Sequence, residues 1–169
     1  MFKAYIVDAS GFINGFTPLV DDFKTFTVPG VLSEIEPNIT LYEVVYSYVK
    51  DGFIFLVEPK VEFMKRIEKE TITTGDAYKL SDVDKKILAL GLQLNGEYNV
   101  TIVTDDYAIQ NTGLNIGINV KNIRERGVSK VIRWVKYCPS CFREYTDEKI
   151  KNCIVCGRAL KLKPSKRTR

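Results

Sequence analysis

Four acidic residues of the sequence are candidates for a metal-dependent catalytic site. Asp8 and Asp106 each follow a short apolar segment typical of a buried strand, whereas Glu34 and Asp84 lie in the first turns of two helical segments. In an open α/β sheet the ligand crevice lies outside the carboxyl ends of the strands, so all four side chains can face one crevice. Carboxylates in one place repel one another unless a cation joins them, and oxygen ligands favour Mg²⁺ or Mn²⁺.

The chain contains no histidine, which narrows the chemistry that these acids could perform. Nucleophile activation by Ser-His-Asp or Cys-His arrangements is excluded, as is cleavage of phosphodiesters by histidine acid/base catalysis. Metal-assisted phosphodiester hydrolysis remains, in which an ion activates a water molecule, polarises the scissile phosphate and stabilises the leaving oxygen. This chemistry needs no covalent intermediate.

Each acid also has a structural explanation that requires no ligand. Asp84 stands three residues after Ser81 and can complete a capping box, Asp106 can favour a helix N-terminus through the helix dipole, and Glu34 can be surface charge. Asp8 differs, because a carboxylate directly after a buried strand is costly unless it has a task. The functional interpretation is therefore strongest for Asp8.

The four cysteines form two C-x-x-C pairs separated by eleven residues, and they are Cys138, Cys141, Cys153 and Cys156. Two such pairs place four thiolates tetrahedrally around one ion, and the intervening segment has the length of a hairpin, as in a zinc ribbon. A rubredoxin-like iron site uses the same ligands, but the short loop and basic flanks favour structural zinc. Reduced thiols suit a reducing compartment, so we expect a cytoplasmic protein.

Segments of alternating strand and helix character position the acids. Strand-like segments occupy 3–7, 25–28, 52–57, 98–104 and 117–120, and helical segments follow at 29–36, 61–70, 81–94 and 107–111. This alternation predicts an α/β fold with a parallel sheet between two layers of helices. No apolar run approaches the roughly 18 to 20 residues of a membrane helix, so we expect no membrane partner.

Charge divides the chain into an acidic body and a basic C-terminal part. Residues 1–120 carry 10 Lys and Arg against 17 Asp and Glu, whereas residues 121–169 carry 15 against 4. The predicted domains are an α/β domain at 1–121, a linker at 122–130, a small cysteine-rich unit at 131–160 and a basic tail at 161–169. Such a basic part indicates a polyanionic partner, most simply nucleic acid, although a solvated surface is the alternative.

Basic and aromatic residues alternate around the cysteines. This combination suits phosphate contact and base stacking on unpaired nucleotides, although the aromatic side chains can equally form the small core of a ribbon. The candidate RNA-binding residues are Arg133, Lys136, Arg143, Lys149, Lys151 and Arg158.

Several motifs together resemble those of PIN-domain ribonucleases. They are I-V-D-A-S near the N-terminus, the acid after V-P-G-V-L-S, L-S-D-V-D at a helix start and I-V-T-D-D-Y after a strand. A PIN domain followed by a four-cysteine zinc ribbon is similar, more specifically, to the endonuclease family that matures the 3′ end of small-subunit ribosomal RNA in archaea and eukaryotes. The segment T-D-D-Y-A-I-Q-N is close to that family's last motif, and the compact chain favours an archaeal-type member.

The resemblance implies a PIN-like three-layer fold and specific roles for the site residues. Ser10 and Thr104 would support the ligands or the attacking water, and the family pattern T-x-D favours Asp106 over Asp105, although Asp105 and Asp82 stay open as additional ligands. The implied ligands of Mg²⁺ or Mn²⁺ are Asp8, Glu34, Asp84 and Asp106. The implied reaction is cleavage of single-stranded precursor rRNA on the pre-ribosomal small subunit. PIN domains often pair, so a homodimer is compatible with the resemblance.

Two other functions stay open from the sequence. A toxin-like PIN ribonuclease would attack messenger or transfer RNA, but such toxins resemble a PIN domain without a ribbon. A non-catalytic RNA-binding ribosome-assembly factor would keep the fold without the activity, and the presence of all four acids counts against it.

Overall fold

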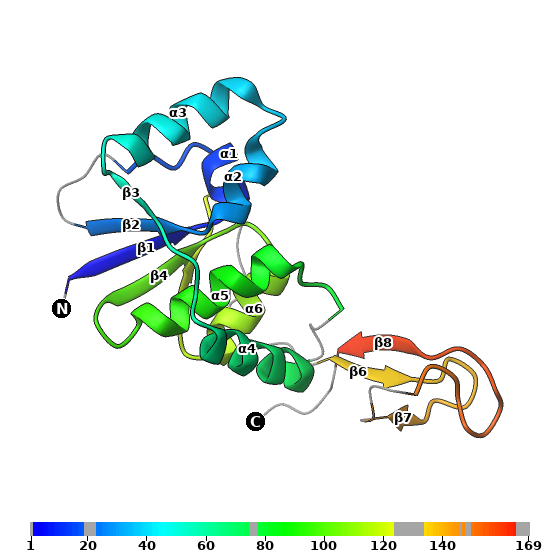
Figure 1. Ribbon diagram of the computed structural model, residues 1–169. Coiled ribbons are helices and arrows are strands. Elements are labelled where there is room, and N and C mark those ends of the chain that lie inside the picture. Colours follow the sequence, from blue (N-terminus) through cyan, green and yellow to red (C-terminus); the bar gives the residue numbers. More distant parts are fainter. Residues whose placement is uncertain are drawn as a thin grey trace.

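The computed structural model describes residues 2–18, 23–74, 78–123, 134–145, 147 and 150–164. They form two units, which we call the α/β domain (described residues up to 123) and the ribbon (described residues from 134) (Figure 1). Within the described part of the chain, no helix has the length and apolar character needed to cross a membrane.

The α/β domain is built on a five-stranded sheet in which all neighbouring strands are parallel. The strands lie in the order β3-β2-β1-β4-β5, and they are β1 (Lys3–Val7), β2 (Phe23–Thr27), β3 (Ile54–Leu56), β4 (Asn99–Val103) and β5 (Asn119–Lys121). The central strand β1 is buried on both faces of the sheet, since Ala4, Ile6 and Val7 are at most 1% exposed. Its register pairs Val7 with Val103, so the residues that follow both strands start from the same edge of the sheet.

Helices cover both faces of this sheet, which confirms the predicted α/β architecture. Figure 1 shows one group, α1 (Ala9–Ile13), α2 (Pro29–Ile35) and α3 (Ile39–Lys50), on one side of the sheet. The second group lies on the other side and comprises α4 (Val61–Thr74), α5 (Asp82–Leu94) and α6 (Tyr107–Asn115). The connections from β1 to β2 and from β2 to β3 therefore lie on one face of the sheet, and those from β3 to β4 and from β4 to β5 lie on the other.

Two helices differ from the sequence prediction. The short helix α1 is not among the predicted helical segments; it forms directly after β1, where the Asp8 carboxylate accepts a hydrogen bond from the Ala9 N–H and caps it. Helix α3 was not predicted. Asn38 caps it, but the exposed apolar residues Ile39, Val44 and Tyr46 stand among the residues that face the core, so apolar spacing in the sequence did not reveal the helix.

A close contact between α2 and α5 fixes the spacing of two of the acids. A Cβ atom added at Gly30 would lie 2.7 Å from Cγ2 of Val83, which is closer than side chains tolerate. Glu34 follows Gly30 by one helical turn, and Asp84 is the neighbour of Val83. The absence of a side chain at Gly30 therefore lets the helices that carry Glu34 and Asp84 approach each other.

The ribbon is a three-stranded antiparallel sheet in the order β7-β6-β8. Its strands are β6 (Trp134–Tyr137), β7 (Glu144–Tyr145) and β8 (Lys161–Pro164). Residues 161–164 were expected to belong to a basic tail, but they pair with the whole length of β6, from Trp134↔Pro164 to Tyr137↔Lys161. The sheet thus extends four residues beyond the expected end of the ribbon. Residues 124–130 of the predicted linker lie outside the described residues.

The Gly30 contact can be tested by substitution. We expect Gly30→Ala to lower the free energy of unfolding by about 1–3 kcal/mol in urea denaturation, because α2 must move away from Val83. Gly96→Ala is the matched control, since a Cβ atom there meets nothing within 4 Å. Adding Val83→Ala to Gly30→Ala should recover part of the loss. Unchanged stability of the single variant would contradict a tight α2–α5 contact.

Candidate active site

Asp8 is a buried carboxylate whose orientation is fixed by three hydrogen bonds. Its side chain is 5% exposed and lies directly after β1. Oδ1 accepts a hydrogen bond from the Ala9 N–H at 2.6 Å, and Oδ2 accepts one from Ser10 Oγ and one from Thr104 Oγ1, each at 2.9 Å. These donors offset the cost of burying the negative charge and leave the carboxylate little freedom to turn.

The hydroxyls of Ser10 and Thr104 connect Asp8 to the loop between β4 and α6. Ser10 Oγ accepts a hydrogen bond from the Asp105 N–H at 2.9 Å, and Thr104 Oγ1 accepts one from the Asp106 N–H at 3.0 Å. Each hydroxyl therefore donates to Asp8 and accepts from the backbone. This arrangement gives both residues a supporting position beside Asp8.

Glu34 and Asp84 lie near Asp8 in an environment that disfavours their charge. Partial burial raises the pKa of Glu34, and the negative charges of Asp8 and Asp84 raise it further. Burial also raises the pKa of Asp84 against the lowering effect of its Ser81 hydrogen bonds, and the charges of Asp8 and Asp106 add to the rise. Electrostatic coupling thus links acids from four separate elements of the sequence.

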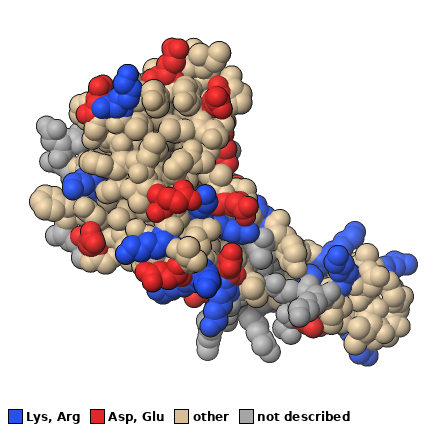
Figure 2. Space-filling view, in the orientation of Figure 1, with Lys and Arg blue, Asp and Glu red and all other residues tan. Residues whose placement is uncertain are grey.

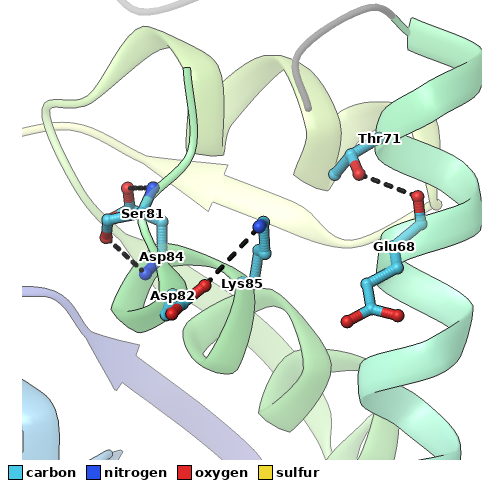
Figure 3. A network of polar contacts seen from close by, with 6 residues as sticks. All are labelled: Glu68, Thr71, Ser81, Asp82, Asp84 and Lys85. Atoms are coloured by element: carbon cyan, nitrogen blue, oxygen red, sulfur yellow. Dashed lines mark hydrogen bonds and ion pairs between the residues drawn. The ribbon is translucent and has the colours of Figure 1, made fainter. Parts of the chain in front are cut away.

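Asp84 also has the structural role that the sequence allowed. Its carboxylate accepts a hydrogen bond from the Ser81 N–H at 2.7 Å, and its own N–H donates to Ser81 Oγ at 3.1 Å (Figure 3). This reciprocal pair is a capping box at the start of α5. The bond from the Ser81 N–H uses Oδ2 of Asp84 and fixes the side chain at the helix N-terminus, and Oδ1 accepts no hydrogen bond from the described residues, so capping and a role in the site are compatible.

Asp106 is exposed at the start of α6. Its Oδ1 accepts hydrogen bonds from the N–H groups of Ala108 at 2.6 Å and Ile109 at 3.3 Å, so it is the N-cap that the sequence allowed. The bond from its own N–H to Thr104 ties this cap to the Asp8 centre.

The two other candidate acids have partners elsewhere. Asp105 accepts hydrogen bonds from Asn14 Nδ2 at 2.5 Å and from the Ile123 N–H at 2.8 Å, one on each carboxylate oxygen. Asp82 is 92% exposed and lies 3.6 Å from the ammonium of Lys85 (Figure 3). Asn14 was not identified from the sequence, because an isolated asparagine after a short helix carries no pattern.

The four acids Asp8, Glu34, Asp84 and Asp106 form a donor set suited to a hard divalent cation. They supply only carboxylate oxygens, their charges repel one another, and a cation would relieve that repulsion. Their oxygens are not as closely gathered as the cysteine sulfurs, which form the one cluster of potential metal ligands found among the described residues. The four acids therefore influence one another electrostatically, but their oxygens do not form a preformed coordination site like that of the cysteines.

The sulfur atoms of the four cysteines lie within 4.8 Å of one another, and the cysteines form no disulfide. Sγ of Cys138 is 3.4 Å from that of Cys156, and Sγ of Cys141 is 3.5 Å from that of Cys153, so each close pair joins the two C-x-x-C motifs. These distances fit four thiolates about 2.3 Å from one zinc ion.

The two C-x-x-C motifs have the same backbone geometry. The N–H groups four residues after Cys138 and Cys153 donate to the carbonyls of these cysteines at 2.9 and 2.8 Å, and the donors, Phe142 and Gly157, both have positive φ. Backbone N–H groups also approach the sulfurs, at 3.4 Å from Ser140 to Cys138 and from Val155 to Cys153. Both turns thus direct N–H dipoles at thiolates.

Tyr145 supports the cysteine cluster from β7. Its hydroxyl lies 3.0 Å from Sγ of Cys153, and this hydrogen bond lowers the pKa of the Cys153 thiol to about 5 and raises that of Tyr145 to about 12. Both shifts favour the state in which the Tyr145 hydroxyl donates and Cys153 carries the negative charge, so Tyr145 has a supporting role beside the cysteines.

The candidate RNA-binding residues are spread over the ribbon. Figure 2 shows Lys and Arg side chains gathered on it. Arg143 and Arg158 are exposed, and their carbonyls accept hydrogen bonds from the N–H groups of Cys138 and Cys153. Lys151 is exposed, whereas Lys136 is half-buried and donates to the Ile150 carbonyl. Arg133 and Lys149 lie outside the described residues.

Comparison with known proteins identifies relatives that cover both units. A family model described as the PIN domain of ribonuclease matches residues 5–94, more than half of the chain. The chain is 32% identical to Endoribonuclease Nob1 of Methanothermobacter thermautotrophicus over 93% of its length and 91% of that protein. It is 34% identical to Endoribonuclease Nob1 of Methanocaldococcus jannaschii over 96% and 79%, and 32% identical to Ribonuclease VapC1 of Thermoplasma acidophilum over 96% and 79%.

The raised pKa of Glu34 predicts a pH-dependent effect on stability. Its native pKa exceeds the ordinary value of 4.5, so the native state binds the proton more tightly and stability falls as pH rises from 4.5 through the native pKa. In buffer without Mg²⁺ or Mn²⁺ at about pH 7, we expect Glu34→Gln to raise Tm by about 1–2 °C, and to have no effect well below pH 4.5.

Glu36→Gln is the control for this measurement, because Glu36 is exposed at the end of the same helix. Adding Mn²⁺ should then raise the Tm of the wild type more than that of Glu34→Gln. A lower Tm for Glu34→Gln at neutral pH would show that Glu34 is not in a repulsive acidic environment.

Proposed function

The chain belongs to the PIN-domain ribonuclease family that includes the archaeal Nob1 endoribonucleases, and from this membership we propose that it cleaves precursor small-subunit rRNA at its 3′ end. The catalytic part of the proposal is supported by two observations: Asp8 and Asp106 follow the adjacent strands β1 and β4 at one edge of the sheet, and charges within the set Asp8, Glu34, Asp84 and Asp106 raise the pKa values of Glu34 and Asp84. The enzyme is an endoribonuclease, and the rRNA substrate and the divalent-metal requirement belong to the proposal.

The roles of the site residues follow from their contacts. Asp8 is the fixed anchor, because all three of its hydrogen bonds come from groups that the fold holds in place. Ser10 and Thr104 orient its Oδ2 through the hydroxyl protons that they donate to it. Asp84, Glu34 and Asp106 provide the remaining negative charge. When bound here, Mg²⁺ or Mn²⁺ would supply a Lewis acid that polarises the phosphate and lowers the pKa of water.

The substrate proposal rests on charge and on the two-unit organisation. An acidic site repels a polyanion, so binding needs a separate positive surface, and the ribbon supplies one with its Lys and Arg side chains (Figure 2). We therefore propose that the ribbon holds RNA while the α/β domain cleaves it. The pre-ribosomal small subunit is the proposed partner, in the cytoplasm, and pairing of two copies is compatible with this function.

A second candidate is an endoribonuclease that acts on a different RNA. The relative named Ribonuclease VapC1 matches 96% of this chain, so the match includes the ribbon. The presence of a ribbon alone therefore does not separate ribosomal RNA from other RNA substrates. The position of the cut distinguishes the two candidates.

Cleavage of an end-labelled RNA that spans the 3′ end of precursor small-subunit rRNA tests the proposal. With Mn²⁺ or Mg²⁺ we expect one cut at the mature end, and Asp8→Asn should lower its rate by about 10³-fold or more, because the variant loses the anchoring charge. RNA binding should persist in this variant.

Asp82→Asn is the matched control, since it removes a carboxylate that is exposed and paired with Lys85. Equal rates for wild type and Asp8→Asn would contradict the site assignment. Metal-dependent cuts at many positions, with none preferred at the mature end, would favour the second candidate, and binding without any cut would favour an assembly factor.

We also propose that the four cysteines bind a structural zinc ion. Zinc removal by a strong chelator, or Cys138→Ser, should unfold the ribbon and weaken RNA binding by about tenfold, without melting the α/β domain. The two units can be followed by separate spectroscopic signals. The single tryptophan of the chain, Trp134, lies in β6, whereas all helices of the described residues lie in the α/β domain.

Tryptophan fluorescence therefore reports on the ribbon and far-UV circular dichroism on the α/β domain. We expect chelation to change the fluorescence and to leave the helical signal and its Tm unchanged. Ser140→Ala, between two of the ligands, is the control for Cys138→Ser. Loss of the helical signal on zinc removal would show that the two units fold as one.

A further inference from the structure

A pocket of about 290 Å³ lies where the ribbon meets the α/β domain. Among the described residues that line it, Tyr78 comes from the α/β domain, in the segment between α4 and α5, and the others come from the ribbon. The ribbon residues are three lysines, Lys136, Lys151 and Lys161, and three aliphatic residues, Ile150, Leu160 and Leu162. No acidic side chain of the described chain lines the pocket, although the α/β domain is acidic overall.

The aromatic and cationic walls of this pocket are close together. The ammonium of Lys136 lies 5.2 Å from the centre of the Tyr78 ring, and it also donates a hydrogen bond to the Ile150 carbonyl at 3.1 Å. The ammonium is therefore held beside the ring rather than free to extend into solvent. Tyr78 remains 62% exposed, so much of its side chain is open to a ligand.

We propose that this pocket binds one unpaired nucleotide of the RNA substrate. The base packs against Tyr78 and the aliphatic walls, and the lysine ammonium groups contact the flanking phosphates. This inference rests on the proposed function, in that the RNA is the enzyme's substrate. A volume of about 290 Å³, just below the usual range of about 300–1,000 Å³ for ligand pockets, suits a single nucleotide rather than a longer segment.

The composition of the pocket favours RNA over an acidic peptide. Both are anionic, but a carboxylate gains little from an aromatic wall or an aliphatic floor, whereas every base has a flat face that stacks on an aromatic ring. The combination of one exposed tyrosine, three aliphatic side chains and three lysines matches a nucleotide, which has a flat apolar part and a charged part.

The position of the pocket relates it to the candidate active site. Tyr78 precedes Ser81 by three residues and Asp84 by six, so a single stretch of chain links the pocket to the capping box of α5. In Figure 1, β6 and β8 lie beside this stretch. A nucleotide bound between the two units would therefore hold the ribbon against the domain that carries the acids. The pocket thus positions the RNA relative to the four acids as well as binding it.

Binding of a labelled single-stranded oligouridylate of about 12 nucleotides tests this proposal. Fluorescence anisotropy of the full zinc-loaded chain, without Mg²⁺ or Mn²⁺, measures Kd while the RNA stays intact. We expect Tyr78→Ala to raise Kd by about fivefold or more and Tyr78→Phe to leave it within about twofold, because phenylalanine keeps the ring. Tyr46→Ala is the control, since Tyr46 is also exposed but lies on α3, far from the ribbon in Figure 1.

The lysines are tested by salt dependence. Each phosphate contact on a single strand contributes about 0.7 to the slope of log Kd against log salt, so Lys151→Gln with Lys161→Gln should lower the slope by about 1.4. Lys3→Gln with Lys50→Gln removes the same charge from the α/β domain and should leave the slope unchanged. Tyr78→Ala should weaken binding without a change in slope.

The outcomes separate this proposal from the proposed function. Equal Kd values for Tyr78→Ala and wild type would overturn the pocket proposal, even if the enzyme cuts precursor rRNA at the mature end. Displacement of the RNA by polyglutamate as readily as by unlabelled oligouridylate would also overturn it, in favour of an acidic protein partner. Tyr78-dependent binding by an enzyme that fails to cut the precursor would support the pocket and reject the rRNA function.

Discussion

Burial of the Asp8 carboxylate at the end of the central strand is the constraint on which the site depends. A charge in this position requires donors, and the chain provides them from α1 through Ser10 and from the end of β4 through Thr104. These two hydroxyls also accept hydrogen bonds from the backbone of the loop that carries Asp106. The placement of one acid thus organises the loop that bears another, and the register of β1 with β4 is what makes the arrangement possible.

Many features of the fold and of the candidate site could be predicted from the sequence, because each of them depends on residues that lie close together in the chain. The apolar strands, the capping box at Ser81 and Asp84, and the two C-x-x-C motifs are all encoded within a few residues, and each appears in the structure. Helix α3 was missed because apolar residues also occupy its exposed positions and hide the helical spacing. Strand β8 was interpreted as a tail because a lysine-rich segment has no strand signal until it pairs with β6. The roles of the four acids in catalysis stay predictions.

Contacts between residues that are far apart in the sequence could not be predicted from motifs or apolar spacing. The partners of Asp105 are Asn14 and the backbone of Ile123, and the Gly30 contact depends on Val83 in another helix. The pocket likewise joins Tyr78 to lysines of the ribbon, one of which lies in the segment that was assigned to the tail. These contacts arise from packing of elements, which hydrophobic periodicity and motif spacing do not determine.

The long sequence separation within the site has a consequence for the folding of the nascent chain. Thr104 and Asp8 are 96 residues apart, and the parallel pairing of β1 with β4 spans the same distance. Loop closure of that length makes the contact slow to form, and β4 leaves the ribosome long after β1 and β2. A partly synthesised chain therefore has no oriented Asp8 and no organised cluster of acids. The α/β domain must therefore be synthesised through β4 and the start of α6 before Asp8 can acquire all of its hydrogen-bond donors.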